Sequence, residues 1–220
     1  SDAQSLNIGA AKVLQGTSTS YDMYAVVTNP NDDWFATFTY RFTAGSITTK
    51  EQDGFAMPGE RAYVMTLGVK AESRPGTPTI TVENIVWHHV DRHVAPDIAD
   101  WLDRHNGFNI SEPTYTTDID FGAKSFGRTT FTVTNITPYS YWEPRYTVVL
   151  ERAGAVVGIT QATLTTFDSG EARNVEVRWY GDIPVTATAT VLPAINYFDP
   201  DVYMPPRGTP GEDIRDSLTR

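Results

Sequence analysis

Apolar and polar residues alternate at every second position along much of the chain, and one such stretch occurs twice. Residues 24–42, YAVVTNPNDDWFATFTYRF, correspond to residues 130–150, TFTVTNITPYSYWEPRYTVVL, when Asn29 is aligned with Asn135. A side-chain period of two is that of a β-strand with one buried face. The pattern therefore predicts neighbouring strands in both stretches.

The residues that follow each copy also correspond in their order. Each copy continues through a glycine to a tight-turn sequence, which is Pro58-Gly59-Glu60 in the first and Ser169-Gly170-Glu171 in the second. Further strands are predicted after each turn, at residues 63–69, 79–87, 174–179 and 185–192. Because the order of elements agrees over roughly 80 residues, the sequence predicts an internal duplication.

The duplication predicts an all-β chain of two tandem β-sandwiches joined by a short helical connector. The expected boundaries are residues 1–90 for the first sandwich, 91–112 for the connector, 113–198 for the second sandwich and 199–220 for a Pro-rich tail. Each unit is small enough to bury only about 60 to 65% of its unfolded surface. Contact between the units would therefore add stability.

The connector carries signals for both ends of one short helix. Pro96 suits the first helical turn, and Asn106-Gly107 suits the end. One face of this helix would hold Ile98, Trp101, Leu102 and His105. A helix of this length is marginal in isolation, so we expect this face to dock on a sandwich and to set the angle between the units.

Composition excludes several classes of function. The chain carries a formal charge of −10 without a cluster of Lys or Arg, so we expect no nucleic-acid partner. It contains no Cys, which excludes disulfides, a thiol nucleophile and Cys-ligated zinc. No apolar run reaches the ~18 residues that a membrane helix needs. Since the sequence begins at Ser1, we expect a signal or membrane anchor to have preceded it.

No catalytic motif is present, so we expect neither an enzyme nor a cofactor. The sequence offers two possible metal sites, and neither is predicted. The loop at residues 29–33 is rich in Asn and Asp but does not match an EF-hand, and its counterpart in the second copy has no carboxylate. If residues 86–94 were extended, His89, Asp91 and His93 could form a zinc site, but a polar, partly exposed linker is the favoured interpretation. Histidines at this joint could also make it sensitive to pH.

Aromatic residues near the start of one predicted strand in each copy are the candidate contact site for a partner. They are Trp34, Tyr139, Tyr141 and Trp142. Rigid aromatic side chains at the rim of a sandwich often contact partners. Trp34 and Trp142 occupy matching positions if the preceding loops differ in length, which also suits a core role. We interpret the tryptophans as core residues and the tyrosines as contact residues.

The repeated pattern resembles the FxLYD-type immunoglobulin-like modules of bacterial exported and membrane-anchored proteins. In the first copy the residues that carry the resemblance are Val27-Thr28-Asn29, residues 38–42, Gly45 and Pro58-Gly59-Glu60. In the second copy they are Val133-Thr134-Asn135, residues 146–150, Gly154 and Ser169-Gly170-Glu171. The resemblance implies immunoglobulin-like sandwiches, a location outside the cytoplasm behind an N-terminal anchor, and no enzyme activity.

We therefore expect two tandem immunoglobulin-like β-sandwiches that act as a non-catalytic binding or assembly module of the bacterial cell envelope, with a protein partner. The alternative is a structural spacer without a ligand of its own. A long free edge strand would favour binding, whereas blunted edges and a rigid joint would favour the spacer. A deep pocket with converging polar side chains between the units would favour an enzyme.

Overall fold

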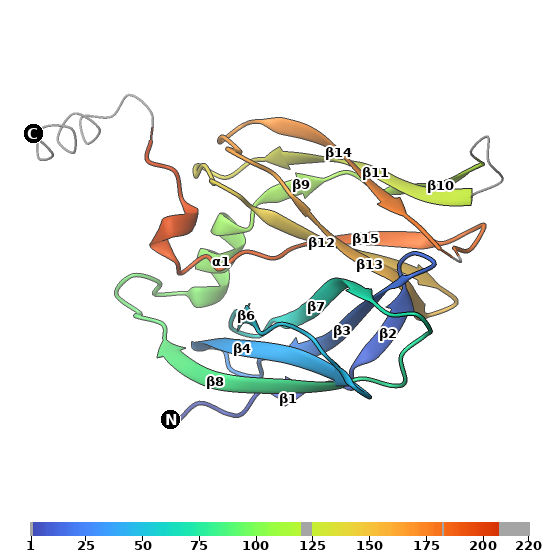
Figure 1. Ribbon diagram of the computed structural model, residues 1–220. Helices are drawn as coiled ribbons and strands as arrows, with labels where there is room; N and C mark the ends of the chain where they lie inside the picture. Colours follow the sequence, from blue (N-terminus) through green and yellow to red (C-terminus); the bar gives the residue numbers. More distant parts are fainter. Residues whose placement is uncertain (1, 120–124, 182, 207–220) are drawn as a thin grey trace, which may run out of the picture.

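The computed structural model describes residues 2–119, 125–181 and 183–206, and most of this part of the chain forms antiparallel strands (Figure 1). Residues 120–124 of the predicted second sandwich and 207–220 of the predicted tail lie outside the described residues. The predominance of antiparallel sheets confirms the expected all-β class. Across the described ranges, no helix has both the length and the apolar character that crossing a bilayer requires.

The N-terminal half, defined here as residues 7–89, contains two antiparallel sheets. Its strands are β1 (Asn7–Ile8), β2 (Lys12–Gln15), β3 (Ser20–Thr28), β4 (Trp34–Ala44), β5 (Ile47–Thr48), β6 (Gln52–Ala56), β7 (Arg61–Lys70) and β8 (Thr79–His89). In one sheet β3 pairs with β1, β2 and β7, and in the other β4 pairs with β5, β6 and β8. The alternating residues of β3 and β4 meet in one core, which includes Met23, Ala25, Val27, Phe38, Tyr40 and Phe42.

The C-terminal half, defined here as residues 108–193, also contains two antiparallel sheets. Its strands are β9 (Phe108–Ile110), β10 (Thr114–Ile119), β11 (Ser125–Asn135), β12 (Arg145–Arg152), β13 (Ala155–Thr163), β14 (Ala172–Trp179) and β15 (Thr188–Pro193). β11 pairs with β9, β10 and β14, and β12 pairs with β13 and β15. The core between these sheets includes Phe131, Val133, Tyr146, Val148 and Leu150. β15 begins three residues later than predicted, and Pro184, which has no N–H to donate to a ladder, lies before it.

A buried asparagine at the end of β3 ties together the corner of the N-terminal half. The Asn29 side chain is fully buried, and its amide donates to the carbonyl oxygens of Trp34 at 2.7 Å, Ala56 at 3.2 Å and Met57 at 3.0 Å. Its backbone N–H donates to the Glu60 carbonyl in the predicted tight turn. The turn itself is closed by the Glu60 carboxylate, which accepts from the Met57 N–H at 2.7 Å.

A second buried asparagine has the same role at the end of β11. The Asn135 amide donates to the carbonyl oxygens of Tyr139 at 2.7 Å and Asp168 at 3.3 Å, and the Asn135 N–H donates to the Glu171 carbonyl. Glu171 closes its turn through the Asp168 N–H. The carbonyl that corresponds to that of Trp34 is therefore that of Tyr139, so the predicted match of Trp34 with Trp142 is wrong. Trp142 lies in the segment between Tyr139 and the start of β12.

Two apolar contacts hold the halves together, and we call the first the distal contact. Tyr24 and Met65 from the N-terminal half pack there against Val149 and Ile159 from the C-terminal half. Val149 alternates with the core residues of β12, so it points out of its own half and is nevertheless only 1% exposed. β12 is therefore covered on both faces.

The second contact, which we call the aromatic joint, surrounds the helix α1 (Ile98–His105). Asp97 caps this helix by accepting the Asp100 N–H at 3.0 Å, so Pro96 precedes the helix and does not begin it as predicted. The predicted apolar face docks as expected: Ile98 is buried, and Trp101 lies between the rings of His105 and Phe198, at centroid distances of 3.6 and 4.7 Å.

The chain returns to this joint after the last strand. Residues 195–204, including the 3-10 helix η1 (Pro200–Val202), cover α1 on the side of the C-terminal half (Figure 1). The hydroxyl of Tyr197 donates to Asn106 at the end of α1, and the ring of Phe198 also stacks on Phe35 of the N-terminal half. The described part of the predicted tail therefore belongs to the folded joint.

Candidate binding groove between the halves

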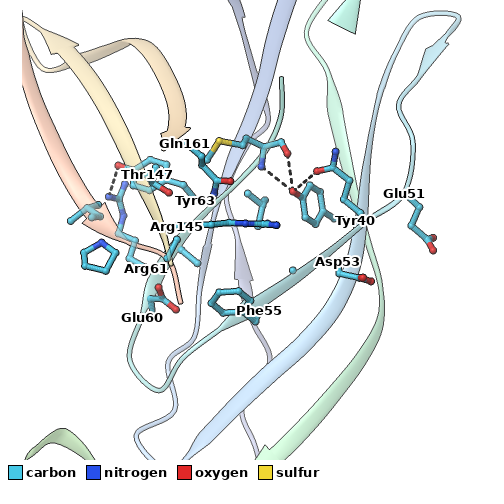
Figure 2. A pocket seen from close by; sticks show the side chains of 18 of the residues that line it. Tyr40, Glu51, Asp53, Phe55, Glu60, Arg61, Tyr63, Arg145, Thr147 and Gln161 are labelled. Atoms are coloured by element: carbon cyan, nitrogen blue, oxygen red, sulfur yellow. Dashed lines mark hydrogen bonds between the residues drawn. The ribbon is translucent and has the colours of Figure 1, made fainter. Parts of the chain in front are cut away.

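A cleft with a volume of about 450 Å³ lies between the two halves (Figure 2). The N-terminal half supplies one wall from β6 and β7, and the C-terminal half supplies the other from β12, β13 and the end of β15. Met65 of the distal contact lines the cleft, as does Phe55 of the aromatic joint. The two apolar contacts therefore hold the walls at a set separation.

A second hollow of about 590 Å³ continues the cleft toward residues 195–202. The two hollows share lining residues at their junction, which are Asp53, Gly54, Phe55, Arg145 and Ala194. We call the combined space the inter-half groove. Its size is that of a ligand site and its lining mixes apolar surface with polar side chains, which is the usual composition of such sites.

Arg145, the first residue of β12, is at the centre of this groove. In Figure 2 its side chain extends across the cleft with the guanidinium group directed toward Tyr40. The side chain is exposed, and no carboxylate of the described residues lies within ion-pair distance of it. Its guanidinium can therefore offer several N–H donors to a ligand in a fixed planar arrangement.

The wall opposite Arg145 is held in place by hydrogen bonds. The Tyr40 hydroxyl lies 2.8 Å from the Met65 carbonyl oxygen and 2.8 Å from Oε1 of Gln52. Burial raises the pKa of Tyr40, so its hydroxyl stays neutral at physiological pH. The Tyr40 hydroxyl is therefore an uncharged polar group, although Glu51, Asp53 and Glu60 lie on the same side of the cleft.

One of the three acidic residues that line the cleft, Glu60, is not an ordinary surface carboxylate. Burial raises the pKa of Glu60 to about 7, although the carboxylate accepts a hydrogen bond from the Met57 N–H, which acts in the opposite direction. The corresponding residue of the C-terminal half, Glu171, is paired with Arg173. Glu60 has Ala62 at the position that corresponds to Arg173. Because burial raises its pKa to about 7, the Glu60 carboxylate is only partly charged near neutral pH.

One wall of the groove is also the edge of a sheet. β6 pairs with β4 along residues 52–56, and within the described residues no strand pairs with its other edge. Residues 52–55 line the groove. Backbone N–H and C=O groups on such an edge can pair with an extended segment of another chain.

The four predicted contact residues do not form one surface. Tyr141 is fully buried, and its hydroxyl donates to the His105 carbonyl at 2.7 Å, so it has no surface for a partner. Tyr139 is half-buried with its ring stacked on His105, which places both tyrosines in the aromatic joint. Trp34 is half-buried and packs edge-on against His89, whereas Trp142 is 44% exposed.

The histidines are also distributed over separate places. The zinc alternative required an extended chain beyond His89, but β8 ends there and the following residues form a turn, in which the Asp91 side chain accepts the His93 N–H. His88 stacks on Phe35. Among the described residues, no group of three or more His, Cys, Asp or Glu is placed to hold a metal ion.

Sequence reasoning missed Arg145 and the groove. The residues that form the site come from β6, β7, β12, β13 and the end of β15, and no short motif connects them. One signal was present: β12 contains Val148, Val149 and Leu150 in succession, and an uninterrupted apolar run is typical of a strand that is covered on both faces. That run indicated that this sheet would face another layer.

Comparisons with known proteins do not assign the chain to a family. No family model matches it, and no curated protein matches it. Among solved structures, an 11S allergen from Cocos nucifera aligns over 98% of this chain and 96% of its own, with 10% sequence identity and a TM-score of 0.12. A structural similarity this weak supports no conclusion about fold or function.

Proposed function

We propose that the chain is a non-catalytic binding or assembly module of a bacterial cell-envelope protein and that a protein partner binds in the inter-half groove. The observation that supports this is the groove itself, with Arg145 unpaired among the described residues at its centre and the free edge of β6 along its wall. A rigid pair of sandwiches with a preformed groove can bind a partner without the entropy loss of closing a hinge.

The architecture proposed for this module is a pair of immunoglobulin-like sandwiches that arose by duplication. Two similarities support it: β4 and β12 are both central strands with neighbours on either side, and buried asparagines tie equivalent corners at Asn29 and Asn135. The location outside the cytoplasm and the N-terminal anchor rest on the resemblance to FxLYD-type modules.

A binding role is favoured over catalysis by the contacts of the polar groups in the groove. Tyr40 hydrogen-bonds to Gln52 and to backbone, and the Glu60 carboxylate accepts from a backbone N–H. Neither group contacts a nucleophile, and a general base must lie within hydrogen-bond reach of the proton it removes. The spacer alternative is favoured by the two apolar contacts that hold the halves together, so it needs a direct test.

Site-specific photo-crosslinking in the source cells separates these alternatives. A photoreactive phenylalanine analogue would replace Gln161 in the cleft or, as a control, Val185, which is 81% exposed and outside the groove. The binding proposal requires a discrete crosslinked product from position 161 that is absent from position 185. Products that are the same from both positions, or no product from position 161, would leave the spacer as the better description.

A further inference from the structure

The lining of the inter-half groove restricts the chemistry of what can bind there. Three basic side chains, Lys50, Arg61 and Arg145, line the cleft together with three acidic ones, Glu51, Asp53 and Glu60. The cleft is therefore balanced in formal charge, although the chain as a whole carries −10. Relative to the rest of the surface, this is a place that an anionic group can approach.

The three basic residues differ in how available they are. The Arg61 guanidinium lies 3.3 Å from the Tyr63 hydroxyl and 5.6 Å from the centre of its ring, so it is already engaged. Lys50 is an exposed residue next to Glu51. Only Arg145 combines a position at the junction of both hollows with a guanidinium group that has no partner in the described part of the chain.

The free edge of β6 lies beside Arg145. Asp53, Gly54 and Phe55 of this strand share the junction of the two hollows with Arg145. At Gly54 an added Cβ would lie 2.5 Å from the ring of Phe38, so a residue with a side chain does not fit there without a shift of the core. This restriction acts on the core side of β6, whereas on the other side Gly54 lines both hollows, so the strand borders the groove there.

We infer that the inter-half groove binds an extended peptide segment that adds to the free edge of β6 and places a carboxylate on the guanidinium of Arg145. Backbone pairing supplies affinity that does not depend on sequence, and the charge-assisted hydrogen bonds of a carboxylate with an arginine supply specificity. The inference rests on the proposed function, since it names the chemistry of the partner that binds there.

A display library of random twelve-residue peptides, selected on the whole protein, provides the probes. Selected sequences would then be synthesised with a fluorescent label and titrated by anisotropy. The expected sequences carry at least one Asp or Glu flanked by residues that favour strands. Replacing that acidic residue by its amide should weaken binding about tenfold to a hundredfold, the range expected for a charged hydrogen-bonded pair.

Three protein variants locate the contact. Arg145→Gln should weaken binding by the same factor as the amide peptide, and the two changes together should weaken it little further. Arg152→Gln is the matched control, because Arg152 is the last residue of β12, is exposed and has no ion pair among the described residues. Gln161→Trp, which places a large ring in the cleft, should abolish binding of every selected peptide, with circular dichroism confirming that the variant is folded.

Backbone pairing has its own readout. A selected peptide that is N-methylated at alternate residues loses the donors on one edge only, so one of the two possible methylation patterns should abolish binding and the other should not. Selected peptides that lose binding with Gln161→Trp could still bind equally well to Arg145→Gln and without their acidic residue. That result would overturn this inference and leave the proposed function standing. If no peptide is enriched, or if Gln161→Trp has no effect, the groove is not a peptide site and this inference fails, whereas the proposed function is decided by the crosslinking from position 161.

Discussion

The two buried asparagines give the most direct test of how the halves are held together at their corners. Asn29→Ala removes an amide that donates to three carbonyl oxygens and an oxygen that accepts from the Asn31 N–H at 3.0 Å. Because the site is closed to water, each buried polar group that is left without another partner destabilises the folded state by about 1 to 3 kcal/mol. The Asn31 N–H loses this acceptor and the carbonyl oxygens lose this donor, although the Met57 carbonyl still accepts from the Glu60 N–H, so we expect a loss of about 3 to 5 kcal/mol in the free energy of unfolding.

We expect a similar loss in the free energy of unfolding at the second corner. Asn135→Ala removes donation to the Tyr139 and Asp168 carbonyls and acceptance from the Thr137 N–H at 3.0 Å. We expect about 3 to 4 kcal/mol, slightly less than for Asn29→Ala because fewer carbonyl groups are involved. A further variant, Asn29→Asp, replaces the donor by an oxygen that faces carbonyl oxygens, and it should be at least as destabilising as the alanine change.

Guanidinium unfolding, followed by tryptophan fluorescence and circular dichroism, measures these losses as shifts of the midpoint at unchanged slope. Asn109→Ala is the control, because Asn109 is exposed in β9, and it should change the free energy by less than about 0.5 kcal/mol. Losses below about 1 kcal/mol for both buried asparagines, or values equal to that of the control, would refute the reasoning that these side chains tie the corners.

Three other predictions test individual contacts. The Tyr146 hydroxyl is buried without a hydrogen-bond partner among the described residues, so Tyr146→Phe should leave the free energy of unfolding unchanged or raise it. Tyr40→Phe removes a hydrogen bond to the Met65 carbonyl and should lower the free energy of unfolding by about 1 to 2 kcal/mol. Chemical unfolding measures both changes. Gly54→Ala forces a shift in the core and should destabilise by about 1 to 3 kcal/mol, whereas Gly76→Ala, with open space around it, should not. Burial lowers the pKa of His105 in the folded state, so the neutral imidazole is favoured there. Its contribution to stability is therefore present above the unfolded pKa of about 6.5 and is lost as the pH falls below that value. His105→Gln should remove this dependence of the melting temperature on pH from thermal unfolding curves recorded across that range.

The sequence predicted the strands well because each strand is defined by neighbours on the chain. The alternation of Phe38, Tyr40 and Phe42 is visible at every second position, and all three side chains are buried as that alternation requires. The helix at the joint was predicted from its apolar face for the same reason. Its first residue was misplaced because Pro96 suits both the first helical turn and the position before a cap, and only the contact of Asp97 with Asp100 distinguishes them.

The groove could not be predicted because its residues come together only when the halves dock. Arg145 looks like an ordinary polar residue at the start of a strand, and its position opposite Tyr40 depends on the packing of Val149 against the other half. The aromatic residues were misjudged for a related reason. Tyr139 and Tyr141 lie in a loop that would be a free rim in an isolated sandwich, but here residues 195–204 and α1 cover that rim.

The aromatic joint also orders the events of biosynthesis. The chain leaves the ribosome from its N-terminus, so α1 is made before the C-terminal half, and the segment that covers it, residues 195–204, is made after both halves. Throughout that interval Trp101 lacks the ring of Phe198 that will stack on it. The nascent chain can form each core and the distal contact before that point, but the aromatic joint is complete only when translation has passed Met204.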